Sequence, residues 1–134
     1  MEPRTAVELQ LLTVAVIIGI VQLFWATGAA RRGQDPKWVV GPQDEPPPAK
    51  SPTAARLDRA FRNFMETFPF FAAAVLTAYL AGKLGTLTLW GSAIYVAARA
   101  LYAPLYAAGV PVVRTVVWLA GTVGIVMVVA AIFL

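Results

Sequence analysis

Four long apolar stretches dominate the sequence and restrict what the chain can fold into. They cover about residues 6–30, 64–81, 86–108 and 110–134. A helix of about 20 residues crosses the hydrocarbon core of a bilayer, and each stretch is close to that length or longer. The chain has 59% hydrophobic but only 13% charged residues, which is typical of a membrane protein. We therefore predict an all-α integral membrane protein, a bundle of four transmembrane helices, as a single domain over residues 1–134.

The first apolar stretch has two interpretations, because its small-residue end is also typical of a cleaved signal peptide. Acidic Glu2 and Glu8 lie before and at the start of the stretch, and Arg31 and Arg32 follow it. This order of charges is the reverse of that in a signal peptide. We therefore expect residues 6–30 to be a retained helix.

The connection between the first two apolar stretches carries most of the positive charge. Seven of the eleven basic residues lie there: Arg31, Arg32, Lys37, Lys50, Arg56, Arg59 and Arg62. Basic residues mark cytoplasmic loops, so we expect the first and third connections to be cytoplasmic and both termini to be extracytoplasmic. The net charge of +4 then records the topology, and we expect no nucleic-acid partner.

Residues 34–52 of this connection contain six of the ten prolines. Proline removes a backbone donor, so we expect neither helix nor strand here, and residues 46–48 to be a solvated connector. The second helix is then expected over about residues 53–81, with Ser51 or Thr53 as its N-cap.

A polar stripe enters the second apolar stretch. At about 100° per residue its members fall within an arc of roughly 120° of one helix. They are Arg56, Arg59, Arg62, Asn63 and Glu66. Such residues are costly in a membrane unless they face protein or water, which makes the stripe a candidate functional site. The alternative is a buried network that only locks helices together.

The third expected helix, residues 86–108, also has one polar face. Six side chains project into an arc of about 80°: Thr88, Ser92, Tyr95, Arg99, Tyr102 and Tyr106. A lone tyrosine in such a helix is usually an interfacial anchor, but three tyrosines aligned with an arginine favour a protein-lined cleft. Arg114, one turn inside the helix expected at 110–134, is placed either at the interface or beside Tyr106.

The absence of two residue types excludes much chemistry. The chain has no cysteine and no histidine, which removes the protein thiol nucleophile, the usual general base and the usual metal ligands. We therefore expect no metal site and no typical hydrolase or metalloenzyme.

The sequence RAFRNFMETFPF at residues 59–70 resembles the second helix of the MAPEG family, the membrane-associated proteins in eicosanoid and glutathione metabolism. That helix carries an R-A-x-x-N-x-x-E signature followed by a Pro-containing apolar run. The R-x-x-x-x-x-x-Y spacing of Arg99 and Tyr106 and the arginine that opens the fourth helix are also similar. We identify the chain as a bacterial-type member, which implies a bacterial inner membrane and a homotrimer with glutathione bound between subunits.

The resemblance implies roles for individual residues. Arg59, Asn63 and Glu66 would belong to the network that holds glutathione, and Arg62 would bind one of its carboxylates. Tyr106 matches a tyrosine lining the glutathione site of the prostaglandin E synthase branch. Arg114 lies near the arginine proposed to stabilise the thiolate in the leukotriene synthase branch. Arg99 and Tyr102, which share the polar face, complete the glutathione-binding candidates.

Two positions depart from the prostaglandin E synthase branch, since Tyr102 stands in place of histidine and Trp118 in place of tyrosine. The implied function is a glutathione-dependent transferase or peroxidase that acts on lipophilic electrophiles or hydroperoxides from the bilayer. A non-catalytic lipid-binding member is the alternative that these departures favour. A small multidrug transporter is the third hypothesis. It requires a deep acidic residue, and we expect the charge of Glu66 to be satisfied by its arginine neighbours.

Overall fold

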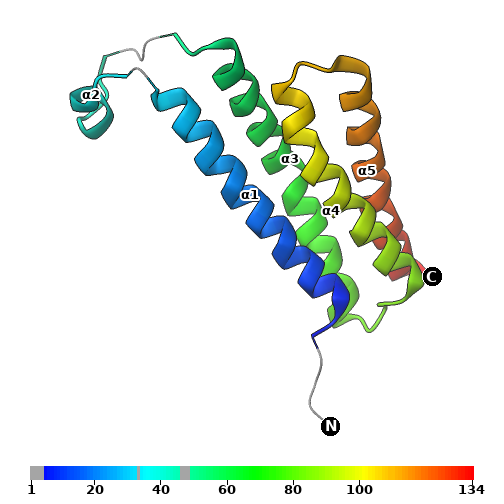
Figure 1. Ribbon diagram of the computed structural model, residues 1–134. Coiled ribbons are helices and arrows are strands. Elements are labelled where there is room, and N and C mark those ends of the chain that lie inside the picture. Colours follow the sequence, from blue (N-terminus) through cyan, green and yellow to red (C-terminus); the bar gives the residue numbers. More distant parts are fainter. Residues whose placement is uncertain (1–4, 33, 46–48) are drawn as a thin grey trace.

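The computed structural model describes residues 5–32, 34–45 and 49–134, and all its regular elements in those ranges are helices. Four are long: α1 (Val7–Arg31), α3 (Pro52–Leu80), α4 (Thr86–Ala107) and α5 (Pro111–Phe133). They alternate in direction, so the end of α1 and the α4–α5 turn lie at one end, which we call the connector end (Figure 1). The start of α1, the α3–α4 turn and the end of α5 lie at the other, the terminal end.

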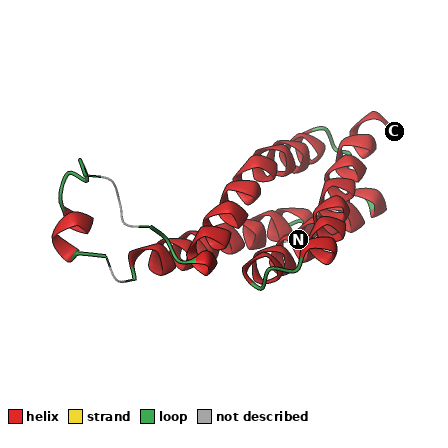
Figure 2. Ribbon diagram, turned by 90° about the horizontal axis from the view of Figure 1, so that it is seen from above, coloured by secondary structure: helices red, strands yellow, loops and turns green. Residues whose placement is uncertain are grey.

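The connection that follows α1 contains a helix that the sequence did not predict. Residues Pro36–Val40 form α2, which lies apart from the long helices (Figure 2). Asp35 caps it, because its carboxylate accepts a hydrogen bond of 2.9 Å from the backbone N–H of Lys37. The expectation of no helix over residues 34–52 was wrong, since proline is well tolerated in the first helical turn. The connector expected at residues 46–48 lies outside the described ranges.

The N-terminus of α3 is fixed by a local cap. The Ser51 hydroxyl accepts a hydrogen bond of 3.1 Å from the backbone N–H of Ala54, and Pro52 occupies the first helical position. Serine satisfies a donor that the helix leaves free, and proline has no N–H to leave unpaired. Ser51 is therefore the N-cap, and the first turns of α3 precede the apolar stretch that begins at about residue 64.

Two of the long helices, α1 and α5, are long and apolar enough to cross a membrane. Only 22% of the most apolar window of each is buried, so most of their apolar side chains face outward, as expected of helices in contact with lipid or another protein. Within the described residues, α3 and α4 do not pass the same test, because the polar stripe and the polar face lower their apolar content. Their crossing of the membrane stays a prediction.

Helices α3 and α4 are central, because each contacts the three other long helices. The core includes Phe71 of α3 stacked on Tyr95 of α4, with ring centroids 4.1 Å apart. Near the terminal end, α4 and α5 touch through backbone, since a Cβ on Gly91 would lie 2.7 Å from the carbonyl oxygen of Gly124. Small residues allow this approach, which maximises van der Waals contact where lipid offers no hydrophobic drive.

The polar face of α4 points into the protein, as its periodicity predicted. Five of its six members are buried: Thr88, Ser92, Tyr95, Arg99 and Tyr102. Thr88 donates a hydrogen bond of 3.0 Å to Glu8 of α1, and the hydroxyls of Tyr95 and Thr67 lie 3.0 Å apart. Most of the face is thus packed interior, and the expected cleft is confined to the connector end.

Candidate functional site

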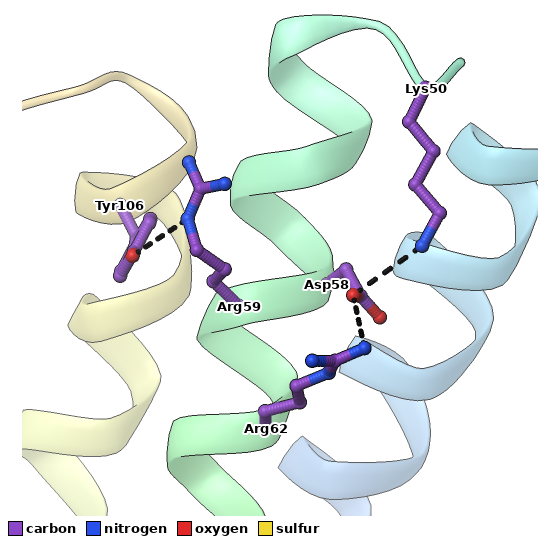
Figure 3. A network of polar contacts seen from close by, with 5 residues as sticks. All are labelled: Lys50, Asp58, Arg59, Arg62 and Tyr106. Atoms are coloured by element: carbon purple, nitrogen blue, oxygen red, sulfur yellow. Dashed lines mark hydrogen bonds and ion pairs between the residues drawn. The ribbon is translucent and has the colours of Figure 1, made fainter.

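Tyr106 is the centre of the candidate site at the connector end. Its hydroxyl accepts a hydrogen bond of 3.1 Å from Nε of Arg59 on α3 (Figure 3). The guanidinium carbon of Arg114 on α5 lies 4.4 Å from the centroid of the same ring. Cation–π contacts of this kind contribute about 0.5–2 kcal/mol each. Two positive charges from different helices therefore converge on one tyrosine.

A second tyrosine continues this arrangement deeper into the protein. The ring centroid of Tyr102 lies 5.6 Å from that of Tyr106, and the guanidinium carbon of Arg99 lies 4.3 Å from the Tyr102 ring. Nη1 of Arg99 donates a hydrogen bond of 2.8 Å to Oδ1 of Asn63 on α3. The spacing of three and four residues places these α4 side chains on one face. Together these side chains form a column in which Tyr102 and Tyr106 lie between Arg99 and Arg114.

A cavity of about 240 Å³, which we call the polar cavity, lies beside this column. Its lining residues are Asn63, Tyr102, Tyr106, Arg114, Thr115 and Trp118. Arg114 is the charged member of the lining, and Arg59 contacts its tyrosine. Guanidinium groups bind carboxylates and other anions through paired N–H donors. The polar cavity is therefore suited to an anionic ligand.

A second, larger space of about 630 Å³ lies between α3 and α5, and we call it the apolar groove. It is lined by Glu66, Thr67, Phe70, Ala73, Ala74, Thr77, Trp118, Thr122, Ile125, Val126, Val129 and Ile132. Trp118 lines both spaces, so its indole ring is a wall that the polar cavity and the groove share. A hydrophilic compartment and a lipophilic one therefore lie next to each other.

The structure brings together most of the residues that the sequence singled out. Asn63, Tyr102, Tyr106 and Arg114 line the polar cavity, and Arg59 and Arg99 contact its tyrosines. The expected cluster of candidates thus forms at one end of the bundle.

Two candidates lie elsewhere. Nη2 of Arg62 lies 3.2 Å from the carboxylate of Asp58, which is also 3.4 Å from Nζ of Lys50 (Figure 3). Glu66 lines the apolar groove and not the polar cavity. Among the described residues, Glu66 has no ion pair with an arginine, contrary to our expectation. The helical arc gives only the direction of each side chain about the axis of α3. An arc of about 120° is wide enough for its members to lie on different sides of a neighbouring helix.

Three residues of this region were not predicted as site residues from their own pattern. Thr115 and Trp118 follow Arg114 by one and four residues, a spacing that places Trp118 one turn along the same side of α5. Asp58 precedes Arg62 by four residues, a spacing typical of helical ion pairs. Within the described residues, no group of three acidic side chains could hold a metal ion.

The fold and the site define an all-helical membrane protein with a basic, tyrosine-rich cavity beside a lipophilic groove. The family model of the MAPEG family matches residues 11–134, nearly the whole chain. The chain therefore belongs to the MAPEG family. No curated protein and no solved structure matches it. Membership supports, in general terms, a membrane role in glutathione-dependent or lipid chemistry.

Proposed function

We propose that the protein is a membrane-bound glutathione-dependent transferase or peroxidase acting on lipophilic electrophiles or hydroperoxides. The observation that carries the proposal is the convergence of Arg59 and Arg114 on Tyr106, at a cavity that shares the lining residue Trp118 with an apolar groove. Such a pair of compartments suits a reaction between a hydrophilic anionic thiol and a substrate that arrives from the bilayer.

The proposed mechanism starts with the thiolate. A cysteine thiol has a pKa of about 8.5, and the thiolate is the reactive species. Arg114 is always charged and favours the anion by direct electrostatics. The Tyr106 oxygen accepts its hydrogen bond from Arg59, which leaves its own O–H proton free to donate to the sulfur. The thiolate would then attack the electrophile and displace its leaving group, or take the distal oxygen of a hydroperoxide and release the alcohol.

The remaining candidates are assigned by their positions. Asn63 and Tyr102 would bind the peptide part of glutathione in the polar cavity. Arg99 would fix the position of Tyr102 through its contact with the ring. Arg62 and Glu66 lie outside the cavity of their own chain. In the proposed homotrimer, these two side chains would complete the glutathione site of a neighbouring subunit.

The proposed topology follows from charge. The connector end carries the basic cluster of α3 and would face the cytoplasm, and both termini would face the other side of a bacterial inner membrane. Hydrophilic glutathione would enter from the cytoplasm, and lipophilic substrate would enter the groove laterally.

The decisive experiment is a titration of glutathione against protein purified in detergent, with binding and ultraviolet thiolate absorbance followed together. We expect saturable binding and a thiolate signal that Arg114→Ala abolishes. Arg31→Ala removes an exposed arginine at the same end of the bundle and is the matched control, with an unchanged signal expected. Intact trimer that shows no glutathione binding would contradict the proposal.

A non-catalytic lipid-binding role is the second candidate, and the size of the apolar groove favours it. The groove has about 630 Å³ against about 240 Å³ for the polar cavity. Bound lipid without turnover of any electrophile or hydroperoxide, in protein that binds no thiol, would select this role.

A further inference from the structure

Arg56 is the member of the polar stripe to which the proposed function gives no role. It lies near the start of α3, and its side chain is half-buried. Nη1 of Arg56 donates a hydrogen bond of 3.4 Å to the backbone carbonyl of Ala107, the last residue of α4. Arg56 is therefore a direct tie between α3 and the turn that connects α4 to α5.

That turn has a backbone conformation typical of helix C-termini, with Gly109 at a φ of +74°. The backbone N–H of Gly109 donates to the carbonyl of Tyr106 at 3.0 Å. The carbonyl of Ala107 follows that of Tyr106, and the last carbonyls of a helix have no intrahelical donor. Arg56 supplies a donor to Ala107, and its positive charge suits the negative end of the α4 dipole.

Gly109 also packs against the guanidinium of Arg56. A Cβ on Gly109 would lie 3.3 Å from the guanidinium carbon, which is tighter than ordinary van der Waals contact. Glycine tolerates a positive φ, and its bare backbone leaves room for the arginine. The conformation of the turn and the position of Arg56 are therefore matched.

The turn joins two parts of the candidate site. Tyr106 lies in the last turn of α4, and Arg114 follows it by eight residues, in the first turn of α5. Arg59, three residues after Arg56, donates to the Tyr106 hydroxyl, while Arg114 lies over the Tyr106 ring. We propose that Arg56 is a positioning residue, which fixes the α4–α5 turn and thereby holds Arg114 and Tyr106 in place beside the polar cavity.

The effect of Arg56 on a bound thiol rests on the proposed function, whereas its effect on the turn does not. A less fixed turn would let Arg114 move away from Tyr106, and the attraction between opposite charges falls with distance. The guanidinium of Arg114 would then favour the thiolate less. Among the described residues, Arg56 is not part of the lining of the polar cavity, so it would act through the turn.

Two measurements on Arg56→Ala in intact, detergent-purified protein test the proposal. Hydrogen–deuterium exchange without glutathione reports on the turn, and we expect the amides of residues 105–113 to exchange about tenfold faster. Glutathione binding and ultraviolet thiolate absorbance, followed together, give the amount of thiolate per bound glutathione. We expect this ratio to fall several-fold. A variant that is merely less stable would bind less glutathione in total, but each bound molecule would ionise as in the wild type.

Gly109→Ala disturbs the same contact without removing a charge, and it keeps the test decisive if Arg56→Ala does not fold. The new Cβ would press on the guanidinium, and alanine is strained at a positive φ. We therefore expect both changes again, in the same direction. Arg56→Lys keeps a long, charged donor and is expected to recover part of both. Arg31→Ala removes an exposed arginine at the same end of the bundle, and we expect neither change.

Unchanged exchange at the turn in folded Arg56→Ala or Gly109→Ala would overturn the inference, and so would faster exchange with an unchanged thiolate ratio. A ratio that falls in Arg56→Ala but not in Gly109→Ala would show that Arg56 acts by its charge alone, which also rejects a positioning role. Wild-type protein that binds no thiol would contradict the proposed function, and the exchange measurement would then decide the inference by itself.

Discussion

The two halves of the α4 inner face share a helix and a spacing, yet one is closed and the other is open. In the terminal half, Thr88 is bonded to Glu8, and Tyr95 is stacked on Phe71 and bonded to Thr67. In the connector half, the tyrosines contact arginines and line the polar cavity. The same pattern of side chains therefore builds a core at one end and a candidate site at the other.

The difference comes from the residues that α5 presents to α4. Gly124 meets Gly91 backbone to backbone in the terminal half, which leaves no room between the helices. Toward the connector end, α5 presents Trp118 and Arg114, and the polar cavity lies beside these bulky side chains. Small residues let α4 and α5 approach each other closely. Where α5 carries long side chains with polar ends, a cavity is left beside them.

The largest effect is expected from Arg114→Ala in the open half. Removal of one preorganised group that stabilises developing charge typically costs about 10²–10³ in turnover. We expect glutathione-dependent turnover to fall about 100-fold, while the free energy of unfolding falls by no more than the about 0.5–2 kcal/mol of the lost contact with Tyr106. Steady-state kinetics and thermal unfolding on the same preparation measure both. If the variant is largely unfolded at the temperature of the assay, the loss of turnover would instead show that Arg114 is structural.

The next largest effect is expected from Gly91→Ala in the closed half. The new Cβ would lie 2.7 Å from the carbonyl oxygen of Gly124, so the helices must separate, at a cost of about 1–3 kcal/mol in the free energy of unfolding. Gly28→Ala is the control, because nothing lies within 4 Å of its new Cβ. We expect it to keep or raise the stability, since alanine favours helix. Equal effects in a thermal unfolding assay would refute the close contact.

Tyr106→Phe is expected to have a smaller effect that is confined to activity. The substitution keeps the ring over which Arg114 lies and removes only the hydroxyl that contacts Arg59. A single lost hydrogen bond to an anion corresponds to about tenfold in turnover. Thiolate absorbance at a series of pH values would show whether the lost donor acts on the sulfur, since the apparent pKa of bound glutathione should rise. An unchanged apparent pKa would remove Tyr106 from the proposed mechanism.

Tyr95→Phe is expected to have the smallest effect, and on stability alone. Its hydroxyl lies 3.0 Å from that of Thr67, and hydrogen bonds between membrane helices contribute about 0.6 kcal/mol on average. We expect a correspondingly small loss in the free energy of unfolding and normal turnover. Together, the two tyrosine variants compare the halves with the same chemical change. Loss of turnover in Tyr95→Phe would mean that the halves are coupled.

Features that repeat along a single helix could be predicted from the sequence. The period of α4 identified its inward face, and the motif at residues 59–70 identified the family. The prediction for the proline-rich connection was wrong at α2. Asp35 and Pro36 form a favourable start of a helix, which a count of prolines does not reveal.

Features that depend on neighbouring helices could not be predicted. Glu66 shares an arc with Asn63, yet Trp118 of α5 lies between the spaces that the two residues line. Which of the two spaces an α3 residue lines therefore depends on how α5 packs against α3, and a helical arc about the α3 axis does not describe that packing. Arg62 similarly pairs with Asp58, a contact typical of i,i+4 spacing that the sequence prediction did not consider.

The shared indole wall has a consequence for inhibitor design. If the two spaces bind the two substrates as proposed, a compound that joins an acidic head to an apolar tail would have to reach past Trp118, so the length and bend of its linker would decide its potency. Compounds with short, straight linkers would occupy one compartment only and compete with one substrate. Longer, bent linkers would compete with both.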